Sequence, residues 1–180
     1  MRNFRNWSAE GYAAVVEHAW TQFGLKTVMT GGGSTQEREM GSRIQSLCHP
    51  EAVIDAIGAT SLKGLLALID RARVVIAPDS GPVHMANALA TPVVGLFATT
   101  NPDRAAPYLW RDYVVNRYPD AVREFLQADP DTITRGQRVR HPDAMSLIRA
   151  DDVIERLDTL LADTASQHRS DLDRESPDEA

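Results

Sequence analysis

The sequence has little cysteine, a deficit of positive charge and no long hydrophobic run. Its single cysteine, Cys48, excludes an internal disulfide and any zinc site built from cysteines. Nineteen lysines and arginines stand against 25 aspartates and glutamates. The resulting net charge of −6 argues against nonspecific binding to nucleic acid or to an anionic membrane surface. No apolar run could cross a bilayer, and the N-terminus lacks the core of a signal peptide, so we expect a soluble, cytoplasmic protein.

The order of apolar patterns predicts an α/β protein. A chain of 180 residues with 43% hydrophobic residues fits one domain with a core. Short β-branched runs alternate with helical patterns, which is typical of a mostly parallel sheet covered by helices on both faces. We expect strands at 25–30, 53–57, 74–77 and 93–97, a peripheral strand at 112–118, and helices at 9–23, 36–47, 62–72, 83–90, 121–127 and 151–161.

Two segments in the last third of the chain lack the alternation of strand and helix patterns. Residues 135–148 show no regular pattern, and we interpret them as irregular. Residues 164–180 are rich in charge and contain almost no apolar side chains. Because such a segment cannot bury enough surface to order itself, we expect a folded domain over 1–163 followed by a disordered tail.

The chemistry of the chain is concentrated between Arg73 and Ala98. Here the turn Asp79-Ser80-Gly81 follows a buried strand and opens a helix, whose first turn accommodates Pro82. Ligands bind at the carboxyl ends of parallel strands, and a helix N-terminus offers unpaired N–H groups to a phosphate. Gly81 allows close approach to the backbone, Ser80 adds a hydroxyl, and His84 lies one helical turn further on. The combination favours an anion-binding site.

The Asp79 turn also admits two other interpretations. Asp79 or Ser80 before a helix is first of all a candidate N-cap, and the turn alone favours that reading. A serine hydrolase is a weak alternative, because no G-x-S-x-G elbow is present and Ser80 and His84 are close together in sequence.

The segment DSGPVHMANALATPVVGLF, followed by TTNPDRAAPY, resembles the C-terminal donor-binding half of glycosyltransferase family 9, the ADP-heptose:lipopolysaccharide heptosyltransferases. That family carries D-[ST]-G-x-x-H, a helix of small residues, P-V-V-x-L-[FY] and a T-x-P loop. The resemblance extends over about residues 2–161. It implies a Rossmann-like domain, the second half of a two-domain GT-B enzyme that moves heptose from ADP-heptose to the lipopolysaccharide inner core with inversion.

The resemblance also implies roles for individual residues. Arg5 in Arg5-Asn6-Trp7 takes the place of the family's cation for the donor diphosphate. A glutamate at the start of the second helix binds the ribose, with Glu37 as our first choice and Glu39 as the second. His84 and Arg5 would stabilise the leaving ADP. The donor would be held by Asp79, Ser80, Gly81, Pro82, His84, Glu37, Thr99, Thr100 and Asn101.

By the same resemblance, the catalytic base and the acceptor surface belong to an N-terminal domain that this chain lacks. We therefore expect the isolated chain to bind donor without transferring heptose, and we expect no cofactor and no metal. Asp129-Pro130-Asp131 has the D-x-D form of metal-dependent glycosyltransferases, but no apolar strand precedes it, so we interpret it as a turn. A peripheral position at the inner membrane, reached through the acceptor, stays open.

Alternatives from other classes also stay open. The chain could be a non-catalytic or vestigial module that binds a nucleoside diphosphate. It could instead be another GT-B enzyme, such as a sugar-nucleotide epimerase, although no convincing acid–base pair is evident. The sequence does not distinguish a truncated product, a fragment and half of a split enzyme, nor does it specify the sugar, the acceptor position or the oligomeric state.

Overall fold

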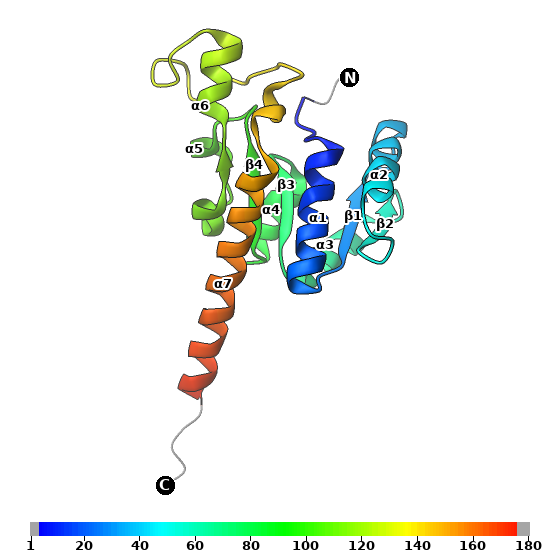
Figure 1. Cartoon of the computed structure of the whole chain (residues 1–180). Coiled ribbons are helices and arrows are strands. Elements are labelled where there is room, and N and C mark those ends of the chain that lie inside the picture. The colour runs from blue at the N-terminus through cyan, green and yellow to red at the C-terminus, as the bar shows by residue number, and fades with distance from the viewer. Residues whose placement is uncertain (1–3, 176–180) are drawn as a thin grey trace.

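Strands and helices alternate along the chain in the computed structural model, which describes residues 4–175, with side chains described through residue 166 (Figure 1). The strands are β1 (Thr27–Gly31), β2 (Val53–Ile57), β3 (Val75–Pro78), β4 (Val93–Phe97) and β5 (Val115–Asn116). The helices are α1 (Ala9–Phe23), α2 (Thr35–Leu47), α3 (Leu62–Arg71), α4 (Gly81–Ala88), α5 (Pro102–Ala105), α6 (Tyr118–Ala121) and α7 (Ala150–Glu175). Short 3-10 segments cover Tyr108–Tyr113 and Ala144–Leu147, and a π-helical turn covers Val122–Leu126.

All the strands in the described residues pair in parallel, but they form two sheets rather than one. β1 pairs with β2, and β4 lies between β3 and β5. Val75 stands opposite Val93 and Pro78 opposite Leu96, so β3 and β4 end side by side. The structure confirms the predicted Rossmann-like α/β architecture, with the correction that no hydrogen-bonded pairing joins β1 to β3 within the described residues.

The centre of the core is β4, in which every residue is buried. Val94 and Leu96 belong to a cluster that includes Val15 of α1 and Leu157 of α7. Val93 lies in a second cluster, with Ile69 of α3 and Val83 and Ala86 of α4. In Figure 1, α1 and α7 lie in front of the sheet and α3 and α4 behind it. Because helices cover both faces, a central strand needs apolar residues throughout, which explains the sequence VVGLF.

Local signals place most element ends where the sequence predicts them. The Ser8 hydroxyl accepts a hydrogen bond from the Gly11 N–H and caps α1, and Gly24 ends that helix with a left-handed φ of 65°. The Leu25 N–H bonds back to Ala19 as part of this cap, so β1 begins only at Thr27 rather than at residue 25. The predicted strand at 112–118 shrinks to Val115–Asn116, because the chain before it forms a 3-10 turn.

The last helix corrects the prediction of a tail. We predicted that the helix ends at 161 and that residues 164–180 are disordered, whereas α7 continues to Glu175. The sequence contains no glycine or proline between Ala150 and Glu175, so nothing local ends the helix at 161. Residues 176–180 of the predicted tail lie outside the described residues. No helix in the described part of the chain combines the length and apolar character needed to cross a membrane.

Candidate functional site

The turn between β3 and α4 leaves the start of a helix open. Ser80 occupies the N-cap position with an extended backbone, but no side-chain hydrogen bond caps α4 among the described residues. The Ser80 hydroxyl donates instead to the Pro78 carbonyl at 2.9 Å, and Pro82 lies in the first helical turn, as predicted. The N-cap interpretation is therefore right for the position of Ser80 and wrong for its side chain. The first amides of α4 stay available to an anion.

Gly81 has open space where a side chain would stand. A Cβ built on Gly81 would meet only the Met85 Cε, at 3.7 Å, which is an ordinary contact. The backbone of Gly81 has no left-handed φ that would require glycine. The fold itself therefore does not explain this glycine, whereas close approach of a ligand to the backbone would.

Asp79 and His84 face one another across the turn. The Asp79 Oδ1 lies 3.5 Å from the His84 Nε2. The Asp79 side chain is only 11% exposed and the His84 side chain 56%. The Asp79 carboxylate is therefore largely buried, while the His84 imidazole remains accessible beside the open helix end.

A buried tryptophan places Arg5 at the same turn. Trp7 is 2% exposed, its Nε1–H donates to the Ile148 carbonyl at 2.9 Å, and its ring meets Tyr12 edge-on. A Cβ on Gly11 would come within 2.5 Å of the Trp7 ring, so glycine at this position makes room for it. The Arg5 Nη1 donates to the Asp79 carbonyl at 2.8 Å. The structure thus brings Arg5 to the Asp79 turn, and its role toward a ligand stays a prediction.

Glu37 forms a capping box at the start of α2. Its carboxylate accepts hydrogen bonds from the Ser34 hydroxyl at 2.6 Å, the Ser34 N–H at 3.0 Å and the Gly32 N–H at 2.9 Å. The Ser34 hydroxyl bond, followed by the Gly32 and Ser34 amides, lowers the pKa of Glu37 below its ordinary value of 4.5. Glu39 is exposed. Of the two candidates for a ribose ligand, Glu37 lies at the glycine loop, but capping already engages both of its oxygens.

The capping box predicts a pH-dependent loss of stability. The lowered pKa of Glu37 means that its contribution is present above pH 4.5 and is lost as the pH falls through the lower folded value. We expect Glu37→Ala to reduce the free energy of unfolding by about 1 kcal/mol at pH 7, and by less at pH 3. Urea unfolding at both pH values measures this difference. Glu39→Ala is the control, and an equal loss at pH 7 and pH 3 for Glu37→Ala would contradict the assignment.

The end of β4 is occupied by contacts with a later segment. The Thr99 carbonyl accepts the Val139 N–H at 3.0 Å, and Thr100 forms an antiparallel bridge with Arg138. The Thr100 hydroxyl is buried and has no hydrogen-bond partner in the described structure. The Asn101 side chain accepts the Asp103 N–H at 2.9 Å and caps α5. Asn101 therefore caps α5, and the roles of Thr99, Thr100 and Asn101 toward a ligand stay predictions.

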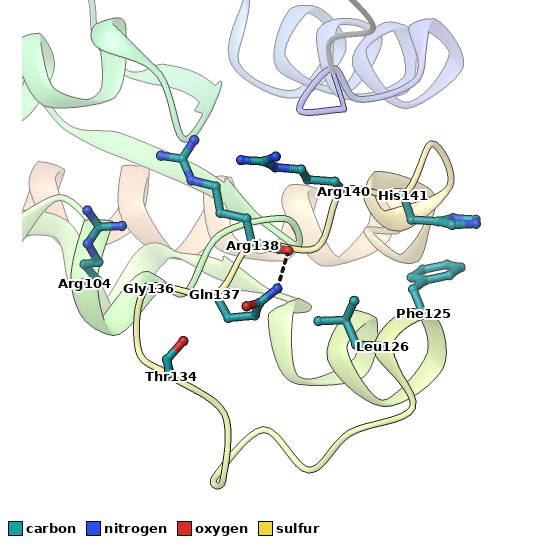
Figure 2. Close-up of a pocket in the computed structure, with 9 residues that line it drawn as sticks. All are labelled: Arg104, Phe125, Leu126, Thr134, Gly136, Gln137, Arg138, Arg140 and His141. Carbon is teal, nitrogen blue, oxygen red and sulfur yellow. Dashed lines mark hydrogen bonds between the residues drawn. The ribbon is translucent and has the colours of Figure 1, made fainter.

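Sequence reasoning missed the segment that covers this edge. Five residues of the segment predicted as irregular, 135–148, line a pocket together with Arg104, Phe125, Leu126 and Thr134 (Figure 2). These five are Gly136, Gln137, Arg138, Arg140 and His141. The available signal was RGQRVRH, with three arginines in seven residues of an acidic chain. The pattern alone could not place this segment beside β4, because the contacts that do so are tertiary.

Neither a metal cluster nor a reactive thiol accompanies this turn in the described part of the chain. Within the described residues, His, Cys, Asp and Glu side chains form no group of three or more that could hold a metal ion. Burial raises the pKa of the Cys48 thiol, with the Glu17 carboxylate as a second cause. A thiol with a raised pKa is a poor nucleophile, so Cys48 supplies no chemistry to this site.

Two solved structures share this fold. A glycosyltransferase family 9 protein from Veillonella parvula superposes with a TM-score of 0.68 at 24% identity, over 90% of this chain and 43% of that one. The Escherichia coli ADP-heptose lps heptosyltransferase II superposes with a TM-score of 0.65 at 23% identity, over 89% of this chain and 43% of that one. The architecture is therefore one found in glycosyltransferases of this type.

Sequence comparison identifies the family. The family model for glycosyltransferase family 9 (heptosyltransferase) matches residues 1–127. The Lipopolysaccharide core heptosyltransferase OpsX of Haemophilus influenzae is 33% identical over 156 residues, 87% of this chain and 44% of that protein. Lipopolysaccharide heptosyltransferase 3 of Escherichia coli K12 is 30% identical over 163 residues, 90% of this chain and 44% of that protein. The chain belongs to glycosyltransferase family 9, and it spans less than half the length of these relatives.

Proposed function

We propose that this chain is the donor-binding half of an inverting, metal-independent glycosyltransferase that moves heptose from ADP-heptose to the lipopolysaccharide inner core. The names of the relatives support the sugar and the acceptor. The observation that carries the proposal is the open N-terminus of α4, with Arg5 and His84 beside the same turn. These groups together suit a diphosphate.

The chemistry follows from the charge that develops on the leaving group. As the bond between the sugar and the diphosphate breaks, negative charge grows on the phosphate oxygens. The amides of α4, the Arg5 guanidinium and the His84 imidazole would stabilise that charge without rearranging. Asp79, held in the turn, would orient His84 through their 3.5 Å contact. The N-terminus of α4, Arg5 and His84 would then stabilise the charge on the diphosphate that a metal ion stabilises in other transferases.

The proposal assigns the remaining steps to another domain. Transfer needs a base within hydrogen-bond reach of the acceptor hydroxyl and a surface that holds the acceptor in line. Near the turn, Asp79 is buried against His84, and at the β1 loop Glu37 is engaged in capping. The isolated chain is therefore expected to bind the donor and to transfer no heptose.

Calorimetry with ADP tests the donor site. We expect binding that is unchanged by EDTA. We expect Gly81→Ala to weaken it about tenfold or more, because the added methyl group would separate a phosphate from the α4 amides and cost at least one charged hydrogen bond. Gly64→Ala is the matched control, since Gly64 lies in the first turn of α3 and a Cβ there would meet only the Ser61 hydroxyl, at 3.4 Å.

The outcomes separate the parts of the proposal. Loss of ADP binding in EDTA would contradict the metal-independent mechanism. Equal affinities for ADP in Gly81→Ala and Gly64→Ala would contradict the placement of the diphosphate at the α4 turn. A heptose-sized mass gain on heptose-deficient core, produced by the chain alone, would show that this half carries its own base.

A further inference from the structure

A recess that shares no residue with the Asp79 turn is a second candidate site. Its volume is about 660 Å³, within the range of small-molecule pockets. Figure 2 shows Arg138 and Arg140 extending from one loop, with the Phe125 and His141 rings at one end and Arg104 at the other. The pocket is lined by Arg104, Phe125, Leu126, Thr134, Gly136, Gln137, Arg138, Arg140 and His141.

The charge of this pocket is uncompensated. Arg104, Arg138 and Arg140 are exposed, and within the described residues their guanidinium groups make no hydrogen bond or ion pair. No aspartate or glutamate lines the pocket. Four arginines outside the pocket are paired with carboxylates, namely Arg43, Arg117, Arg123 and Arg149. Arg71 and Arg73 are also exposed without such a pair in the described structure, but neither lines this pocket. In a chain of net charge −6, three unpaired arginines in one recess form a local site for an anion.

The loop that carries two of these arginines is held in place. Val139 is fully buried against Tyr118 and Val122, and its N–H donates to the Thr99 carbonyl. The Tyr118 hydroxyl donates to the Gln137 carbonyl at 2.7 Å. Burial of Val139 and these hydrogen bonds fix the backbone from which the Arg138 and Arg140 side chains extend (Figure 2). A fixed loop presents both cations without the entropic cost of ordering it on binding.

The other lining groups suit a sugar rather than a bare ion. The His141 ring stacks on Phe125 with centroids 4.1 Å apart, which offers an apolar surface to a sugar ring. The Thr134 hydroxyl and the Gln137 amide oxygen can bond to hydroxyl groups. The Gln137 amide nitrogen already donates to the Arg138 carbonyl at 3.2 Å, which fixes that side chain.

We propose that this pocket binds a sugar bearing a phosphate or a carboxylate, separately from the nucleotide at the Asp79 turn. The arginines form hydrogen bonds to the oxyanion, and the polar and aromatic groups contact the sugar. The net negative charge of the chain disfavours nucleic acid as the occupant. This inference does not depend on the proposed transferase activity, because it concerns binding to the chain alone.

Titration of the full chain with three hexoses tests the proposal. We expect glucose 6-phosphate or glucuronate to bind, in the presence of saturating ADP as well as in its absence, and neutral glucose to bind at least about tenfold more weakly. Binding of only one acid identifies the oxyanion. Rising salt should weaken the interaction.

Paired arginine variants supply the control. Arg138→Gln/Arg140→Gln should weaken binding of the acidic sugar about tenfold or more while leaving ADP affinity unchanged. The control Arg123→Gln/Arg149→Gln removes the same number of positive charges from arginines that lie outside the pocket and pair with carboxylates. It should have little effect on binding of the acidic sugar. If the first variant fails to fold, Arg104→Gln, on α5, replaces it. Displacement of the acidic sugar by ADP, equal loss in both double variants, or no binding of either acid would overturn the proposal.

Discussion

Replacing Trp7 with alanine is expected to lower the free energy of unfolding by about 3–5 kcal/mol, the range for truncating a buried large aromatic side chain. Trp7 is 2% exposed and belongs to the cluster that joins α1, β4 and α7. The change would also leave the Ile148 carbonyl without its 2.9 Å donor. Urea unfolding followed by circular dichroism measures the loss without depending on tryptophan fluorescence.

Two variants define the origin of that loss. Trp20→Ala removes a half-exposed tryptophan that stacks on His49, and we expect it to cost less. Trp7→Phe keeps an aromatic ring but removes the N–H donor, and should fall between wild type and Trp7→Ala. If Trp7→Ala were as stable as Trp20→Ala, Trp7 would not anchor the N-terminal segment.

Removal of the Arg5 guanidinium is expected to weaken ADP binding about tenfold or more, because a hydrogen bond to a charged group contributes about 1.5–3 kcal/mol. Arg5 reaches the Asp79 carbonyl and so lies at the turn where we place the diphosphate. Adenosine carries no phosphate, and its affinity should change much less than that of ADP. Calorimetry on Arg5→Ala with both ligands measures this contrast.

Arg43→Ala serves as the control for charge. Arg43 pairs with Glu10 on the surface, 3.1 Å away, and we place no ligand there. Its removal should leave both affinities unchanged. A similar loss of adenosine and ADP binding in Arg5→Ala would indicate that the arginine shapes the turn rather than contacting the diphosphate.

The sequence predicted those parts of the fold that depend on neighbouring residues. Ser8 and Gly24 mark the two ends of α1, Ser8 through a hydrogen bond to the first turn of the helix and Gly24 through one to its last turn. The uninterrupted apolar run of β4 follows from burial on both faces. α7 was cut short in the prediction because its amphipathic stripe weakens after Leu161, although no residue there breaks a helix.

Features that depend on distant contacts could not be predicted in the same way. The resemblance to family 9 drew attention to Arg5, but only the structure shows that Trp7 anchors this segment to Ile148. Thr100 is predicted as a cleft residue because it follows a strand, but its bridge with Arg138 joins distant residues and no local pattern indicates it. The basic pocket likewise exists only because Val139 is buried beside β4, which no local pattern in residues 135–141 reveals.

The Trp7–Ile148 hydrogen bond has a consequence for the order of folding. It joins residues 141 positions apart, so the loop it closes contains most of the chain. Contacts of such large sequence separation form late, because the entropy of closing the loop is lost before the contact stabilises it. We therefore expect Arg5, two residues before Trp7, to join the Asp79 turn late in folding, after the segment around Ile148 has docked on Trp7.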